Sequence, residues 1–272
     1  MSSAPSAVSG SPLRLVTIPI SHYCEKARWA LDRAGIDYHE ERHVQGVHRV
    51  AARRAGGGVT VPVLVTPGGA IGESHEILEW VDARTPPERR LFPAEPRARA
   101  EVDALCARFD EVLGPAGRRL LYVHMLGQRE LVLAFNDAGV PRWEDRTVRY
   151  GLPLMARLLR RALRIVPGIE VEDEAVCFGE LDHVAELLAD GRPYLLGERF
   201  GAADLTFAAL SAPLIVPPEY GVPLPAPHMT RPATAALIER ARAHPAGRYA
   251  LGLFNRQRRP ATAAAVAATG TA

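Results

Sequence analysis

The sequence contains very little lysine, few cysteines and no long apolar run. Of its 33 lysine and arginine residues, Lys26 is the only lysine, and the three cysteines are Cys24, Cys106 and Cys177. This odd and sparse set does not make a disulfide framework. No stretch approaches the run of about 18 apolar residues that a membrane-spanning helix needs. A net charge of only +2 gives no sign of a nucleic acid or another polyanion as partner.

The remaining composition is that of a folded globular protein. The 272 residues are 47% hydrophobic and 24% charged, which excludes disorder over the whole length, and the length is typical of two domains. The abundance of alanine, arginine, glycine and proline indicates a GC-rich, bacterial genome. Residues 1–12 have neither the basic nor the apolar part of a secretory signal. We therefore expect a cytoplasmic protein with no membrane association and with disordered ends at 1–12 and 258–272.

Residues 13–84 alternate between strand and helix patterns. Apolar residues after Tyr23 have helical spacing up to Gly35, a residue suited to a helix C-terminus. Pro62 lies inside a β-forming run, where it must start a strand, lie at an edge or form a cis turn. Ser74 is the expected N-cap of the last helix. The expected elements are strands at 13–18, 38–44, 59–66 and 70–72, and helices at 23–34, 47–55 and 76–84.

Beyond a proline-punctuated linker at 85–96, the strand signals disappear. The pattern predicts an all-helical domain over 97–257, with Gly114 and Pro115 interrupting or kinking its first helix. Gly201 is a tolerable N-cap for a helix in which Asp204 stands three residues later, at the position of a capping carboxylate. The expected helices lie at 97–113, 118–135, 153–166, 172–189, 202–214 and 232–243.

The start of the first helix carries residues suited to thiol chemistry. Ser21 precedes His22, Tyr23 and Cys24 at this point. A helix N-terminus presents unpaired N–H groups and the positive end of the dipole, and both stabilise an anion such as a thiolate. The alternative interpretation of Ser21 is a plain helix cap.

Two further segments are suited to binding a peptide-like ligand. If the bond before Pro62 is cis, the backbone N–H and C=O of Val61 are exposed to a ligand. Glu73 and Ser74 open a helix, where a carboxylate and a hydroxyl can take the amino and carboxylate groups of a ligand. The structural alternatives are an edge-strand proline and another helix cap.

In their order and spacing, these segments resemble the glutathione S-transferase superfamily. The resemblance is strongest in the stretches SHYCEKARWAL (21–31), VPVL (61–64), ESHEIL (73–78) and FGAADLTFAAL (200–210). It implies an α/β thioredoxin-like domain with a mixed four-stranded sheet over 13–84, followed by an all-α helical-bundle domain. It also implies glutathione as the cofactor and a homodimer formed through the helices at 76–84 and 97–113.

The resemblance implies a role for each matched residue. Ser21 matches the thiolate-activating hydroxyl of the serine-type classes, and Cys24 matches the second cysteine of a glutaredoxin CxxC motif. The stretch 53–60 departs from the family pattern, so Arg53 or Arg54 is the replacement to consider for the contact with the glycine carboxylate of glutathione. The implied cofactor-binding residues are Tyr23, Val61, Pro62, Glu73 and Ser74.

The region 114–179 is longer than is usual in the family, and we expect it to build or cover the site of the second substrate. Five of its residues supply aromatic and polar character for such a pocket, although helix packing explains any one of them equally well. These pocket candidates are Tyr122, His124, Met125, Trp143 and Tyr150. The histidines at 39, 43 and 48 do not share one face, and no carboxylate spacing resembles a metal motif, so no metal site is expected.

We therefore expect a glutathione S-transferase-like enzyme that stabilises the glutathione thiolate for attack on a small-molecule electrophile. Three alternatives stay open. The same site could serve a glutathione-dependent cis-trans isomerase of a conjugated double bond, as in zeta-class relatives. Cys24 could form a mixed disulfide with glutathione. The fold could also serve a non-catalytic ligand carrier or scaffold.

Overall fold

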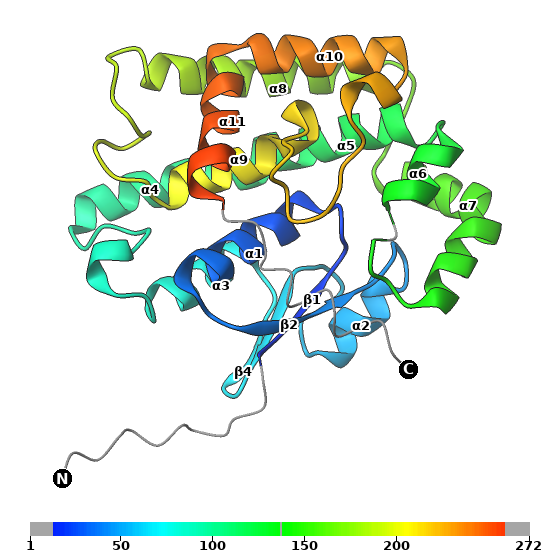
Figure 1. The fold of residues 1–272 in the computed structure, drawn as a ribbon, viewed down its shortest axis with the longest axis horizontal. Coiled ribbons are helices and arrows are strands. Elements are labelled where there is room, and N and C mark those ends of the chain that lie inside the picture. The colour runs from blue at the N-terminus through cyan, green and yellow to red at the C-terminus, as the bar shows by residue number, and fades with distance from the viewer. Residues whose placement is uncertain (1–12, 137, 259–272) are drawn as a thin grey trace.

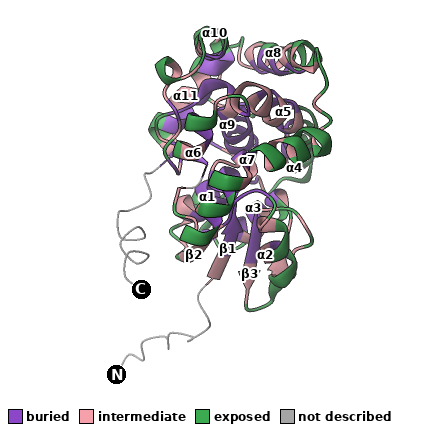
Figure 2. Cartoon of the chain, turned by 90° about the vertical axis from the view of Figure 1, so that its right-hand side faces the viewer, coloured by how far each residue is buried: buried purple, intermediate pink, exposed green. Residues whose placement is uncertain are grey.

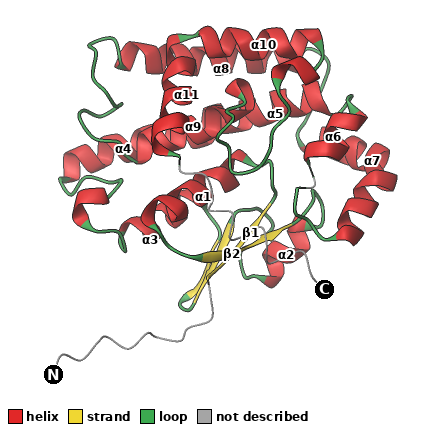
Figure 3. Ribbon diagram, in the orientation of Figure 1, coloured by secondary structure: helices red, strands yellow, loops and turns green. Residues whose placement is uncertain are grey.

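The structure, a computed structural model, describes residues 13–136 and 138–258 (Figure 1). The ends expected to be disordered, at 1–12 and 259–272, lie outside these residues. A sheet occupies one end of the molecule and a stack of helices the other (Figure 3). Within the described ranges, no helix is long and apolar enough to cross a membrane.

The N-terminal part is built on a mixed four-stranded sheet in the order β2-β1-β3-β4. Strand β1 pairs parallel with β2 and antiparallel with β3, and β3 pairs antiparallel with β4. The predicted mixed sheet and its β-α-β-α-β-β-α order are therefore confirmed. The elements are β1 (Leu13–Thr17), α1 (His22–Ala34), β2 (Tyr38–Arg42), α2 (His48–Arg54), β3 (Val63–Thr66), β4 (Gly69–Ile71) and α3 (Ser74–Asp82).

Local signals set most boundaries of this part. Gly35 ends α1 in the left-handed conformation, with φ of 72°. The Val61–Pro62 bond is cis, and β3 begins only at Val63, since proline has no N–H for the ladder. The prediction of Ser74 as N-cap is wrong by one residue: Glu73 is the extended N-cap, and Ser74 is the first helical residue.

The C-terminal part is helical, as predicted. It contains α4 (Pro96–Arg108), a π-helical segment η2 (Phe109–Leu113), α5 (Gly114–Met125), α6 (Arg129–Phe135), α7 (Arg142–Ala162), α8 (Ile169–Leu187), α9 (Ala202–Ile215), α10 (Pro232–Ala243) and α11 (Pro245–Gln257). Single-turn 3₁₀ helices η1 (Pro87–Arg89) and η3 (Pro227–Met229) lie in the connections.

Three helix boundaries differ from the prediction. Gly114 and Pro115 do not interrupt the first helix, because η2 carries α4 directly into α5. The helix expected at 118–135 is divided between α5 and α6. Helix α7 begins eleven residues before Pro153, the predicted start, and contains that proline. The Arg149 carbonyl, which the missing Pro153 N–H would have bound, accepts a hydrogen bond from Arg129 instead (2.9 Å).

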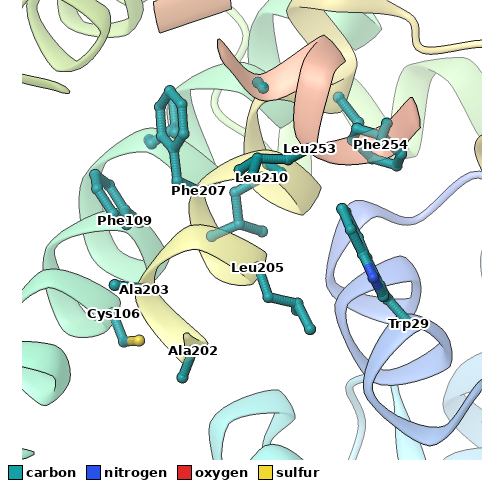
Figure 4. Close-up of a cluster of buried hydrophobic side chains, with 14 of the residues drawn as sticks. Trp29, Cys106, Phe109, Ala202, Ala203, Leu205, Phe207, Leu210, Leu253 and Phe254 are labelled. Carbon is teal, nitrogen blue, oxygen red and sulfur yellow. The ribbon is translucent and has the colours of Figure 1, made fainter. Parts of the chain in front are cut away.

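Helix α9 is the centre of the helical part. Of its 14 residues, 13 are buried, and it packs against α1, α4, α5, α10 and α11 (Figure 2). Gly201 is its N-cap, as predicted, and donates its N–H to Asp204 (2.8 Å). Figure 4 shows Phe207 and Leu210 of α9 among side chains from α1, α4 and α11. One continuous core therefore joins the two parts.

The C-terminal end of the described chain is fixed by buried charges. Arg258 was expected in the disordered tail, but its side chain is buried and bonds to Glu25 (2.6 Å) and Asp32 (2.7 Å) of α1. Arg28, also buried, bonds to the second oxygen of Glu25 (2.9 Å). The disordered tail was predicted to begin at 258, but Arg258 is ordered. Its side chain is the partner that the buried Glu25 carboxylate on α1 needs.

We predict that Arg258→Ala lowers the free energy of unfolding by about 3–5 kcal/mol, because it leaves the buried Glu25 carboxylate without one of its partners. Urea unfolding measures the change. Arg256→Ala is the matched control: its side chain is exposed, and the change should lie within about 0.5 kcal/mol. Equal stability of the two variants would show that the buried pair does not hold this end.

Candidate functional site

A cleft of about 610 Å³ lies between the sheet domain and helices α5 and α7. All catalytic and cofactor-binding candidates except Cys24 line it, from three separate segments: Ser21, Tyr23, Val61, Pro62, Glu73 and Ser74. Three connections meet in this cleft because the four-stranded sheet brings them to one edge. They are the segment after β1, the turn before β3 and the start of α3.

Ser21 is the N-cap of α1. Its Oγ accepts a hydrogen bond from the Cys24 N–H at 3.4 Å, and its own N–H donates to the Ile18 carbonyl (3.1 Å). The capping interpretation is thus correct, and the hydroxyl still retains its own proton for donation. Since Ser21 is half-buried and lines the cleft, this proton is available to a ligand.

The opposite wall offers unsatisfied backbone groups. Neither the N–H nor the C=O of Val61 forms a backbone hydrogen bond within the described ranges, and Val61 lies outside β3. Helix α3 has no side-chain cap, so its first N–H groups have no side-chain partner. They belong to the start of the helix, where Glu73 and Ser74 line the cleft. The Glu73 carboxylate is exposed. This wall can therefore hold the backbone and the two charged groups of an extended peptide.

Tyr23 is fixed by the helical domain. Its hydroxyl donates to the Asp110 carbonyl in η2 (2.7 Å), and burial raises its pKa. In a π-helical register this carbonyl would bind the N–H that Pro115 lacks, so the tyrosine hydroxyl takes the place of that N–H. Because the hydroxyl is already committed, it does not compete with Ser21 for a thiolate.

His22 and Lys26 complete the contact between α1 and the segment at 110–114. His22 is buried and donates from Nε2 to the Gly114 carbonyl (3.0 Å), and burial together with Arg118 lowers its pKa to about 3. The fully buried Lys26 ammonium donates to both oxygens of Asp110, at 2.7 and 2.9 Å. The neutral histidine and the ion pair leave no net charge in this contact.

Cys24 does not belong to the site. Its side chain is fully buried and does not line the cleft, and burial raises the pKa of its thiol to about 11. The interpretation of Cys24 as nucleophile therefore fails on geometry and on charge. The cause is its position three residues into α1, where the helix turns the side chain toward the core.

Of the five pocket candidates, three line a cavity and two are exposed on the surface. Tyr122 lines the cleft and also a smaller, mostly apolar pocket between α5, α6 and α10, which His124 and Met125 line as well. Trp143 and Tyr150 line neither cavity, and 56% and 85% of their surfaces are exposed. Their assignment to the pocket is wrong, because α7 begins at Arg142 and they occupy the helix face opposite its buried residues.

Several cleft residues were missed in the sequence. Arg118 lies one helical turn before Tyr122 on α5, and Leu159 and Leu163 reach the cleft from α7. Arg49 lines it from α2, whereas the predicted Arg53 and Arg54 are exposed elsewhere. Among 32 arginines no local pattern marks Arg118; its four-residue spacing from Tyr122 was the available signal.

Of the histidines near β2, His48 lines the cleft, whereas His39 and His43 do not. His43 bonds to Glu144 (2.7 Å) and Glu41 (2.9 Å), and burial lowers the pKa of His48 to about 4. Over residues 13–136 and 138–258, no group of three or more histidine, cysteine and acidic residues is placed to hold a metal ion.

Comparison with known proteins finds a match for the N-terminal domain and solved structures of the same fold. Residues 15–89 match the glutathione S-transferase N-terminal domain. A glutathione S-transferase from Sinorhizobium meliloti 1021 is 20% identical, with a TM-score of 0.56 over 94% of this chain and 98% of that one. Another, from Xanthobacter autotrophicus Py2, is 21% identical, with a TM-score of 0.53 over 86% and 94%. A third, from Methylobacillus flagellatus KT with GSH bound, is 18% identical, with a TM-score of 0.52 over 88% and 98%.

Among curated protein sequences, no match to the chain was found. The solved structures establish the fold: a thioredoxin-like domain followed by a helical domain. Residues 15–89 therefore match the glutathione S-transferase N-terminal domain, and the chain as a whole shares the fold of solved glutathione S-transferases. The resemblance seen in the sequence is therefore confirmed.

We predict that Gly114→Ala lowers the free energy of unfolding by about 1–3 kcal/mol, a typical cost of overpacking. A Cβ at this position would lie 2.2 Å from Tyr23 Oη and 2.7 Å from Cζ, so the ring must leave its bond to Asp110. Urea unfolding measures the loss. Gly151→Ala in α7 is the control: nothing lies within 4 Å of the new Cβ, and stability should rise by about 0.5–1 kcal/mol. A similar gain at Gly114 would contradict the close contact.

We predict that none of the three cysteines reacts rapidly with a chromogenic disulfide reagent in the native protein. All three are buried, and burial raises the pKa of Cys24 and Cys106 to about 11 and that of Cys177 to about 12. At pH 7 a thiol of pKa 11 is thiolate in only about one molecule in ten thousand. All three should react after unfolding in urea. Fast labelling of Cys24 in the native state would restore it as a nucleophile.

Proposed function

We propose that this chain is a glutathione transferase that stabilises the glutathione thiolate for attack on an electrophilic small molecule. One observation carries the proposal: a hydroxyl at a helix N-terminus, an open stretch of backbone and an uncapped helix N-terminus line the same cleft. A homodimer formed through α3 and α4, in the bacterial cytoplasm, belongs to the same proposal.

The groups of the sheet domain fit an extended glutathione. The free N–H and C=O of Val61 are suited to the backbone of the cysteinyl residue. The Glu73 carboxylate attracts the ammonium of the γ-glutamyl end, and the first N–H groups of α3 at Ser74 attract its carboxylate. Arg49, at the rim of the cleft, is suited to the glycine carboxylate. Two solved relatives, from Methylobacillus flagellatus KT and Xanthomonas axonopodis pv. citri, have glutathione bound, which supports this choice of ligand.

Ser21 and the start of α1 are suited to lowering the pKa of the bound thiol. Glutathione, when bound, supplies a thiolate that attacks an electrophilic carbon. A free thiol has a pKa of about 8.5, and lowering it by two units requires about 2.7 kcal/mol. One hydrogen bond from a hydroxyl to a charged acceptor, together with the helix dipole, is of this size. The hydroxyl donates this bond while its Oγ still accepts from the Cys24 N–H.

The helical domain would hold the electrophile. Leu121 and Tyr122 of α5, and Leu159 and Leu163 of α7, supply an apolar wall that faces the Ser21 end of the cleft. In this proposal, the long region at 114–179 provides binding surface for the second substrate and excludes water from the thiolate.

We predict that wild-type protein lowers the pKa of bound glutathione by about two units and that Ser21→Ala abolishes most of this shift. Titration of the thiolate by ultraviolet absorbance across pH measures it. Ser21→Thr keeps the hydroxyl and should keep the shift. Because loss of the cap costs about 1 kcal/mol of stability, each variant is first checked for a native unfolding transition.

Cys24→Ala is the matched control and should leave the thiolate titration unchanged, since its sulfur lies outside the cleft. If wild-type protein binds no glutathione, the transferase proposal fails and a carrier or scaffold takes its place. If glutathione binds and a conjugated double bond is isomerised without net consumption of thiol, the isomerase alternative replaces conjugation.

A further inference from the structure

Arg118 is a cation in the cleft that lacks a partner. It lines the cleft from α5, and its Nε is buried without a hydrogen bond to any described residue. No carboxylate in the described part of the chain lies within ion-pair distance of it. The next residue of the same helix, Arg119, does have a partner, because its Nε donates a hydrogen bond to Asp173 (2.7 Å).

The acidic residues of the cleft do not supply the missing partner. Asp110 is held by Lys26 through both oxygens. Glu111 is exposed and forms no ion pair with Arg118. Glu73 belongs to the opposite wall, at the start of α3. The positive charge of Arg118 therefore faces the cleft itself.

Arg118 is half-buried, and its surroundings leave the buried Nε without a polar contact. Leu121 and Tyr122 follow it on α5, and Leu159 and Leu163 of α7 line the same cleft. The buried Tyr122 hydroxyl already accepts a hydrogen bond from Gln45 (3.0 Å). A guanidinium beside apolar side chains is stabilised by an anion that forms charge-assisted hydrogen bonds with it.

We propose that Arg118 binds an anionic group, such as a carboxylate, on the second substrate, so that the electrophile is an apolar molecule with a negative charge. The identification of this ligand as the electrophile rests on the proposed transferase function. Arg118 lies on the helical wall with the apolar residues, whereas the groups suited to the two ends of glutathione lie on the sheet domain. The planar guanidinium is suited to a carboxylate in a fixed orientation, and this would direct the apolar body along Leu121, Leu159 and Leu163.

A pair of fluorescent probes tests the inference without the unknown substrate. Anilinonaphthalene sulfonate carries one negative charge, and N-phenylnaphthylamine is the same aromatic body without it. The affinity of each probe is measured by titration for wild-type protein, Arg118→Gln, Arg118→Lys and Arg146→Gln. Arg146→Gln is the matched control, because it removes the same charge from an exposed position of α7 outside the cleft.

We expect Arg118→Gln to weaken binding of the sulfonate probe by about tenfold or more, the size of one or two charged hydrogen bonds, and to leave the neutral probe unchanged. Arg118→Lys should recover part of the affinity, and Arg146→Gln should bind both probes as wild type does. Since no partner is lost, Arg118→Gln should unfold at the same urea concentration as wild type or a higher one.

Three results would overturn the inference. The sulfonate probe could bind Arg118→Gln as tightly as wild type, or both probes could weaken equally, which would indicate packing alone. Glutathione binding, measured separately by calorimetry, could be lost in Arg118→Gln while the sulfonate probe still binds, which would assign Arg118 to glutathione. If wild-type protein itself fails to bind glutathione, the transferase proposal falls, and the probe pair still decides whether Arg118 recognises an anion.

Discussion

The burial of three charged residues in one turn of α1 constrains the whole molecule. Glu25, Lys26 and Arg28 are at most 2% exposed, although the helix joins a sheet on one side to a helical domain on the other. A buried charge is tolerated only with a partner, and removing one partner of a buried pair is costly. The partners come from β2, from η2 and from the C-terminal end of α11. The helix therefore fits only one arrangement of these elements.

The cleft follows from this arrangement. Asp110 binds Lys26 through its side chain and Tyr23 through its carbonyl, so one residue of η2 fixes two positions of α1. The π-helical register of η2 presents that carbonyl, and Gly114, without a side chain, admits the tyrosine ring. Ser21 caps the same helix one turn earlier. The position of the Ser21 hydroxyl in the cleft therefore depends on the buried contacts that hold α1 against η2.

Sequence reasoning succeeded where a signal is local. The left-handed turn at Gly35 and the cap at Gly201 each depend on residues a few positions apart, and both are present. For Pro62 the local pattern left a strand start, an edge or a cis turn open, and the structure has the cis bond. It failed where the outcome depends on distant contacts. Trp143 is exposed because α7 begins at Arg142, well before Pro153, and the Arg149 carbonyl that this proline leaves free accepts a hydrogen bond from Arg129 of α6.

The two walls of the cleft offer different kinds of groups to a ligand. The sheet domain presents backbone groups and helix N-termini, whose positions follow from the fold and change little with side-chain substitution. The helical domain presents side chains from α5 and α7, among them Arg118, and none of these is specified by the architecture. Motifs in the sequence therefore point to the first wall and say little about the second. Under the proposed function, specificity for the second substrate would reside in the wall where only three-dimensional contacts distinguish one arginine among 32.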